Sequence, residues 1–221
     1  ERGAARERVI VCPNGIDTER FNVSVKPDDA HAAGVPEDAF VIGFHGRERP
    51  WHGFGHLVEV VGGLIRRDLP VHLLVVGEGA FEALGSLPDE RYTRVGWQPH
   101  EKVPGFVAAF DALPLTYAPD APCYFSPLKL AEAMACGVVP LVPQLGDLPD
   151  QVDHDGTGLV YPAGDWACLE SQLAGLVRDR AMRDRLGESA ARRAAELGWD
   201  RIAQRVLDTT GAGVRMAAGR G

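Results

Sequence analysis

The sequence has few cysteines and lacks the spacings at which cysteines bind metal ions or exchange disulfides. Its four cysteines, Cys12, Cys123, Cys136 and Cys168, include no Cys-x-x-Cys pair. Each lies in an apolar or helical context, where cysteine commonly packs as a small apolar side chain. This usage indicates a reducing compartment, and we therefore expect a cytoplasmic protein.

Long apolar runs and basic clusters are also absent. No stretch reaches the roughly 20 residues of a membrane-spanning helix, and the charged residues 1–8 do not have the pattern of a signal peptide. The net charge is −8 at pH 7, with Lys and Arg scattered among carboxylates, which argues against nucleic acid as a partner. No internal repeat or low-complexity linker divides the 221 residues, so we expect one domain over residues 1–210 and a Gly/Ala-rich, frayed tail at 211–221.

Short apolar runs rich in Val, Leu and Ile do recur along the chain, separated by amphipathic segments. The runs do not alternate apolar with polar residues, which is typical of strands buried on both faces of a parallel sheet. The candidate strands are Val9–Cys12, Phe40–Phe44, Val71–Val76, Ala112–Leu115, Val138–Val142 and Gly158–Tyr161.

Apolar stripes at helical spacing occupy the segments between these runs. The alternation of strand and helix predicts an α/β fold with a Rossmann-like, doubly wound, mostly parallel sheet. Because such sheets bind ligands beyond the carboxyl ends of their strands, the site should lie in the loops that follow the strands. The stripes are Leu57, Val60, Val61, Leu64 and Ile65, and then Val103, Phe106, Val107 and Phe110, with further helices expected over Trp166–Arg178, Ala181–Leu197 and Asp200–Thr210.

The loop Gly43–Gly53 combines glycines with cations directly after a predicted strand. Glycine lets the backbone approach a ligand, and the planar guanidinium of Arg47 can bind two phosphate oxygens at once. His52 can supply a second donor. In the alternative interpretation, Arg47 and Arg49 are solvated loop residues and His52 caps the helix.

A second glycine-containing loop, Gly77–Glu82, opens like a dinucleotide-binding fingerprint and then departs from it. Glu82 stands where the third glycine would be, and the loop follows an interior strand rather than the first one. We interpret it as a tight strand-to-helix turn, and NAD binding is the weakest interpretation of the chain.

The segment Tyr124–Gly137 has the pattern of a helix entry followed by a buried strand. Ser126 suits the N-cap and Pro127 the first helical position, so the free amides of the first turn would face out at the strand ends. Such a helix end attracts phosphate. Lys129 in the first turn conflicts with the helix dipole, and a bound anion would remove that conflict.

Glu132 is a carboxylate on a stretch otherwise rich in Leu, Ala and Met, and there it needs a partner. It can accept two hydrogen bonds from a ribose diol. It can instead pair with Lys129, three residues before it on the same helix face. The spacing leaves both interpretations open.

Several segments together resemble the retaining glycosyltransferases of the GT-B fold, the group that includes sucrose synthase-like and bacterial mannosyl- and glucosyltransferases. The resemblance covers nearly the whole chain and depends on separate motifs in the family's order. These motifs are Val11–Phe21, similar to the "PNGVD…F" segment; Pro50–Gly53, the phosphate-side loop; Gly96–Trp97, the base-binding turn; Ser126–Gly137, the diphosphate and ribose helix; and Leu148–Val160, the "LPE…DGxxG" stretch.

The resemblance implies metal-independent transfer, with retention, from a UDP-, GDP- or ADP-sugar, and no cofactor. Negative charge that develops on the departing diphosphate would be stabilised by cationic side chains and by the amino end of a helix. The implied roles are diphosphate stabilisation by Arg47, His52 and Lys129, ribose binding by Glu132, contact with the base by Trp97, and further donor contacts from Gly46, Tyr124, Ser126, Pro127 and Leu128.

Two positions depart from the family pattern. The residue before the glycine of the first loop is usually lysine, whereas His52 stands here, and a neutral imidazole gives less charge stabilisation. The family signature also has a glutamate, seven residues and a second glutamate. Glu132 is the second, but Tyr124 occupies the first position, which normally helps to hold the donor sugar. The resemblance therefore does not identify the sugar.

A GT-B enzyme also has an amino-terminal acceptor domain of comparable size. We therefore expect this chain to be the C-terminal, donor-binding half of a longer enzyme, inactive alone, whose full form is compatible with peripheral membrane contact. Two alternatives stay open. One is a GT-B domain like that of nucleotide-sugar 2-epimerases, and the other is a non-catalytic nucleotide-binding module, which the departures at Tyr124 and His52 favour.

Overall fold

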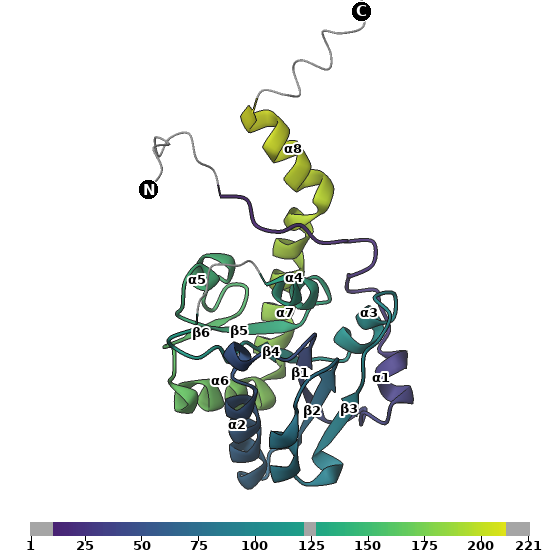
Figure 1. Cartoon of the computed structure of the whole chain (residues 1–221), viewed down its shortest axis with the longest axis vertical. Coiled ribbons are helices and arrows are strands. Elements are labelled where there is room, and N and C mark those ends of the chain that lie inside the picture. Colours follow the sequence, from purple (N-terminus) through teal and green to yellow (C-terminus); the bar gives the residue numbers. More distant parts are fainter. Residues whose placement is uncertain (1–10, 122–126, 211–221) are drawn as a thin grey trace, which may run out of the picture.

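Six parallel strands form one sheet in the order β3-β2-β1-β4-β5-β6 (Figure 1). The computed structural model describes residues 11–121 and 127–210. The strand order reverses between β1 and β4, which confirms the predicted Rossmann-like, doubly wound α/β fold. The strands are β1 Phe40–His45, β2 Val71–Val76, β3 Tyr92–Val95, β4 Ala112–Pro114, β5 Val139–Pro143 and β6 Leu159–Tyr161.

Helices cover both faces of this sheet. Helices α2 and α6 pack on one face, while α3 and α4 pack on the other. The α-helices are α1 Asp28–Ala32, α2 Phe54–Arg66, α3 Val103–Val107, α4 Leu128–Ala135, α5 Leu148–Gln151, α6 Trp166–Arg178, α7 Arg180–Ala194 and α8 Trp199–Thr210, and the short 3-10 helices are η2 Pro50–His52, η3 Glu82–Ser86, η4 Asp89–Arg91 and η5 Ala195–Leu197.

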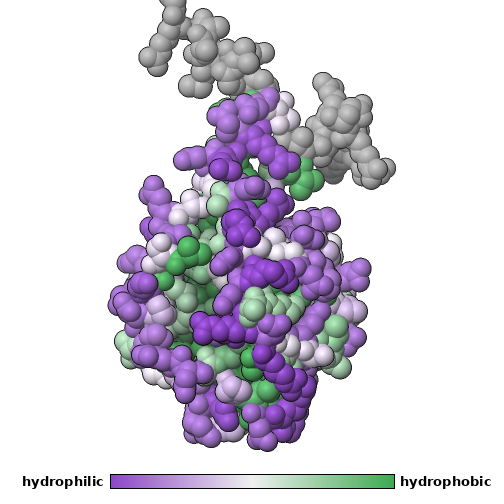
Figure 2. Space-filling view, turned by 180° about the vertical axis from the view of Figure 1, so that it is seen from behind, coloured by the Kyte–Doolittle hydropathy of each residue, from purple (hydrophilic) through white to green (hydrophobic). Residues whose placement is uncertain are grey.

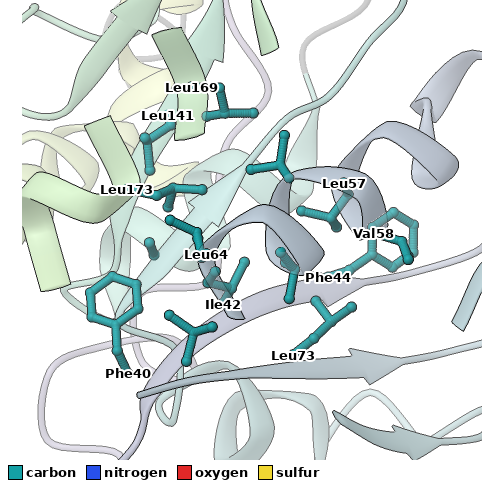
Figure 3. Packing of buried hydrophobic residues seen from close by; sticks show 14 of the residues in the cluster. Phe40, Ile42, Phe44, Leu57, Val58, Leu64, Leu73, Leu141, Leu169 and Leu173 are labelled. Carbon is teal, nitrogen blue, oxygen red and sulfur yellow. The ribbon is translucent and has the colours of Figure 1, made fainter. Parts of the chain in front are cut away.

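The central strands are mainly apolar, apart from His45 in β1 and His72 in β2, because both of their faces are buried. In β1, Phe40, Ile42 and Phe44 point to the cluster beneath α2 and α6, while Val41 points to the cluster on the opposite face. Figure 3 shows the first cluster, in which Leu64 of α2 lies beside the side chains of β1. Strand β1 is thus covered by helices on both faces, as is usual in a parallel sheet, and its parallel pairing with β2 and β4 places the loop that follows it.

Helix α8 leaves the body of the domain and extends beyond it (Figure 1). Seen from behind, the surface of the domain is mainly hydrophilic, with smaller apolar areas between the polar ones (Figure 2). Within residues 11–121 and 127–210, no helix combines the length and apolar character that crossing a membrane requires.

The apolar runs predicted five of the six strands to within one residue at either end, and the predicted helix Trp166–Arg178 has the same bounds in the structure. The exception among the predicted strands is Val9–Cys12: residues 11 and 12 are not in a strand, and residues 9 and 10 lie outside the described residues. Val11 is exposed, so burial in a sheet does not stabilise a strand at this position. Strand β3 was not predicted, because it is a half-exposed edge strand with a polar composition.

Candidate functional site

The loops after β1 and β2 and the helix that follows β4 meet at the carboxyl edge of the sheet, next to the point where the strand order reverses. This is the place where doubly wound sheets bind ligands. A pocket of about 590 Å³ opens there, and four of the predicted site residues line it. Its lining comprises His45, Gly46, Arg47, Val76, Gly77, Glu78, Trp97, Gln98, His100, Val103 and Glu132.

The floor of the pocket is formed where two glycine loops touch. Gly46 has φ +103° and Gly77 has φ +134°, a region that favours glycine. A Cβ on Gly77 would collide with the carbonyl oxygen of Gly46. The Gly77 loop is therefore the tight turn that the sequence predicts, although the 3-10 helix η3 follows it in place of an α-helix. It also supports the Gly46 loop, which it touches.

Arg47 lies at the rim of the pocket and pairs with Glu78 across the two loops, with Nη2 3.1 Å from Oε2. The side chains are 64% and 54% exposed, so water screens the pair, and such pairs contribute about 0–1 kcal/mol. A phosphate can therefore displace Glu78 from Arg47 at little cost. Trp97 is 66% exposed at the same pocket and presents an aromatic surface to it.

Glu132 is buried on α4 and its carboxylate contacts two histidines. His45 Nε2 donates to Oε2 at 2.8 Å, and His100 Nε2 lies 3.7 Å from Oε1. Burial alone would raise the pKa of Glu132, but the hydrogen bond and charge interaction with His45, together with His100, outweigh burial and lower it. The predicted alternative, an ion pair with Lys129, does not describe this arrangement, because the residue bonded to Glu132 is His45.

Lys129 and His52 lie together beside the pocket, against Phe44 and Tyr117. Lys129 Nζ is 3.5 Å from His52 Nε2 and 4.7 Å from the centroid of the Phe44 ring. Burial lowers the pKa of Lys129 to about 8. Burial, followed by the charges of Lys129 and Arg49, lowers the pKa of His52 to about 4, so its imidazole is neutral at pH 7.

The tautomer of His52 follows from its other contact. His52 Nδ1 accepts the backbone N–H of Arg49 at 3.1 Å, so the proton of the neutral ring is on Nε2. His52 therefore caps the short helix η2. The capping interpretation concerned the following helix, α2, which has Gly53 at its N-cap and no side-chain cap. The Nε2–H group and the Lys129 ammonium are both donors, and their 3.5 Å contact is not a hydrogen bond. An anion beside them can accept from both.

Helix α4 begins one residue later than the sequence predicts. Pro127 occupies the N-cap with ψ 114°, and Leu128 is the first helical residue. An extended ψ of this kind is ordinary for a residue that precedes a helix, which is why Pro127 fits outside the helix as well as inside it. Lys129 does lie in the first turn, as predicted, where backbone amides have no acceptor within the helix. Tyr124 and Ser126 lie outside the described residues.

Sequence reasoning missed the two histidines that hold Glu132. His45 is the last residue of β1 and the one polar side chain of that buried strand, which is the signal that could have identified it. His100 follows the Gly96–Trp97 turn, but nothing in its spacing connects it to Glu132. In the described ranges, 11–121 and 127–210, no group of three or more His, Cys, Asp or Glu residues is arranged to hold a metal ion.

The fold and pocket define a Rossmann-like α/β protein with a ligand pocket at the switch point of its sheet. The chain belongs to the family described as glycosyl transferases group 1, whose model matches residues 39–179. It is 30% identical over 219 residues to a D-inositol 3-phosphate glycosyltransferase from Saccharomonospora viridis, a match that covers 93% of this chain and 50% of that protein. It is 28% identical to a phosphatidyl-myo-inositol mannosyltransferase from Mycobacterium leprae, over 90% of this chain and 52% of that protein. The chain thus spans about half the length of these relatives.

Solved structures of other proteins have the same fold. The crystal structure of HepE from Anabaena in complex with UDP-glucose has a TM-score of 0.76 and 21% identity, covering 95% of this chain and 59% of that one. The C-terminal domain of a glycosyl transferase group 1 family protein from Francisella tularensis has a TM-score of 0.69 and 18% identity, covering 82% of this chain and 97% of that domain. At these identities, the similarity establishes the fold.

Proposed function

We propose that this chain is the donor-binding domain of a glycosyltransferase that moves a sugar from a nucleoside-diphosphate sugar to an acceptor, with retention and without a metal ion. Membership of the family supports sugar transfer. The UDP-glucose complex of HepE supports a nucleotide-sugar donor at this fold. The observation that supports the proposal most strongly is the pair of donors, Lys129 Nζ and His52 Nε2–H, facing each other beside the first turn of α4.

The side chains of the site then have distinct roles in the reaction. When the bond between the anomeric carbon and the diphosphate breaks, negative charge builds on the departing phosphate. Lys129, His52 and Arg47 stabilise that charge, with help from the amides at the start of α4. Glu132 receives the ribose hydroxyls and Trp97 stacks on the base, so the nucleotide stays fixed while the sugar leaves it.

We further propose that the acceptor is held by a region that corresponds to the rest of the longer relatives. Catalysis needs the acceptor in line with the anomeric carbon, and orientation of that kind accounts for a large part of enzymatic rate enhancement. The 221-residue chain alone should therefore bind donor without transferring sugar. Sugar transfer by the purified chain would contradict this part of the proposal.

Isothermal titration calorimetry with UDP-, GDP- and ADP-glucose in EDTA tests the donor site. We expect one nucleotide series to bind. Absence of binding in every series, with circular dichroism showing a folded α/β protein, would refute the donor-domain proposal. Binding that disappears in EDTA and returns with Mg²⁺ would instead refute only the metal-free site.

A further inference from the structure

The two carboxylate oxygens of Glu132 face two different histidines. Oε2 accepts from His45 at 2.8 Å, while Oε1 lies 3.7 Å from His100. His100 is in turn held by Arg20, whose Nη1 is 2.7 Å from Nδ1. A chain of polar contacts therefore runs from the surface at Arg20 to the end of β1 in the interior.

The two histidines differ in how firmly they are held. His45 is 4% exposed, sits at the end of a buried strand and packs against Phe110 with ring centroids 5.9 Å apart. The side chain of His100 is 57% exposed and its contact with Glu132 is longer than a hydrogen bond. A ligand that approaches Glu132 from the pocket can displace His100, but it cannot displace His45.

The buried environment of His45 makes its bond to Glu132 hard to replace. Within the part of the chain that the structure describes, His45 Nδ1 is buried and has no hydrogen-bond partner. The Nε2–H to Glu132 bond is thus the polar contact that fixes the ring, and it also fixes the rotation of the carboxylate. Without that donor, burial would favour the protonated carboxyl, which offers fewer lone pairs to ribose hydroxyls.

We propose that His45 is a positioning residue, which holds Glu132 ionised and oriented so that Oε1, in place of its loose contact with His100, can accept from the nucleoside. Nucleoside affinity thereby depends on a residue that acts through Glu132. The inference deepens the proposed function and depends on it, because it takes the ribose to be the group that Glu132 receives.

The test compares three variants of the full 221-residue chain by calorimetry against the nucleoside and the nucleoside diphosphate of the series that binds the wild type. His45→Leu removes the donor and keeps much of the volume. His45→Gln retains an N–H donor at a similar reach. The control is His72→Leu, which removes another buried strand histidine, one bonded to the hydroxyl of Thr93 at 2.9 Å, on the neighbouring strand β2 and outside the pocket.

We expect His45→Leu to weaken both ligands about tenfold, as loss of one charge-assisted contact would, and His45→Gln to restore most of the affinity. His72→Leu should lower the melting temperature without changing affinity. In a Glu132→Gln background, His45→Leu should have no further effect on affinity. If His45→Leu lowers the melting temperature as His72→Leu does but binds with wild-type affinity, the positioning role is refuted.

A ligand-free measurement keeps this inference separate from the proposed function. Carboxyl carbon-13 NMR titration should show the pKa of Glu132 rising in His45→Leu and staying at its wild-type value in His72→Leu. If the wild-type chain binds no nucleotide, the donor-site proposal fails, while the titration still decides whether His45 controls Glu132. An unchanged pKa of Glu132 in His45→Leu overturns the inference.

Discussion

Lys129 Nζ and His52 Nε2 lie 3.5 Å apart, and the pKa values of both residues are lowered, chiefly by burial. At neutral pH, Lys129 is a cation and His52 is a neutral hydrogen-bond donor. The pair therefore combines a single positive charge with N–H donors from two side chains. This combination suits a diphosphate, which needs donors around several oxygens as well as charge.

The lowered pKa of Lys129 predicts that donor binding depends on pH. Because Lys129 loses its proton at about 8, below the ordinary range of lysine, its charge is present below pH 8 and is lost above it. Affinity for the nucleotide-sugar should therefore fall as pH rises from 7 to 9.5, by roughly up to tenfold per pH unit above 8. The affinity of the Lys129→Arg variant for the nucleotide-sugar should change little between pH 7 and 9.5, because arginine stays charged. Equal slopes for Lys129→Arg and the wild type in calorimetry at pH 7–9.5 would contradict the prediction.

Arg47 should contribute to binding of the phosphates and not of the nucleoside. Arg47→Ala is expected to weaken binding of the nucleoside diphosphate by roughly 1.5–3 kcal/mol and to leave the nucleoside nearly unaffected. The matched control is Arg67→Ala, which breaks a similar pair, Arg67 Nη1 to Glu170 Oε1 at 3.0 Å, on residues outside the pocket. Equal losses for the two ligands would remove Arg47 from the phosphate site.

Glu132 should be needed for nucleoside and nucleoside diphosphate alike. Glu132→Gln keeps the size of the side chain but loses the charge that receives the ribose hydroxyls, and it should weaken both ligands by roughly 1.5–3 kcal/mol. The preference for ribose over 2′,3′-dideoxyribose ligands should disappear. Calorimetry with ribose and dideoxyribose ligands measures this preference. A Glu132→Gln variant with the wild-type ratio of the two affinities would show that Glu132 does not bind the ribose hydroxyls.

The contact between the two glycine loops should be sensitive to a single methyl group. Gly77→Ala combines a strained φ with a collision against the Gly46 carbonyl oxygen, so it should reduce the free energy of unfolding by about 1–3 kcal/mol. Gly85→Ala is the control, because a Cβ there meets no atom within 4 Å. Urea unfolding measures the free energy of unfolding of both variants. Equal values would mean that the two glycine loops can move apart without loss of stability.

The sequence was most informative where burial is uniform. The runs that became β1 and β2 are buried on both faces, so their apolar composition alone identifies them. Strand β3 was not identifiable in this way, because an edge strand is half-exposed and its side chains need not be apolar. Local patterning likewise placed Lys129 correctly in the first turn of a helix, since the preceding proline restricts where that helix can begin.

The partners of Glu132 illustrate what a local pattern cannot supply. Three-residue spacing offered Lys129 as its partner, but His45, 87 residues away in the chain, occupies that role. Lys129 turns instead toward Phe44 and His52, which come from β1 and η2. Only the parallel pairing of β1 with β4 brings these segments together, and no periodicity within one segment contains that information.

The order of strands in the sheet also bears on how the protein is made. Because β1 lies between β2 and β4, its second neighbour comes from residues near Ala112, which pair with Ile42 some 70 positions earlier. During synthesis, β1 therefore leaves the ribosome well before its second neighbour in the sheet, β4, exists. Parallel pairing across such separations is slow to form, because the entropy of closing the loop must be overcome first. The interval between emergence of Phe40 and that of Pro114 is thus the period in which β1 lacks its second neighbour and its unpaired edge can contact other chains.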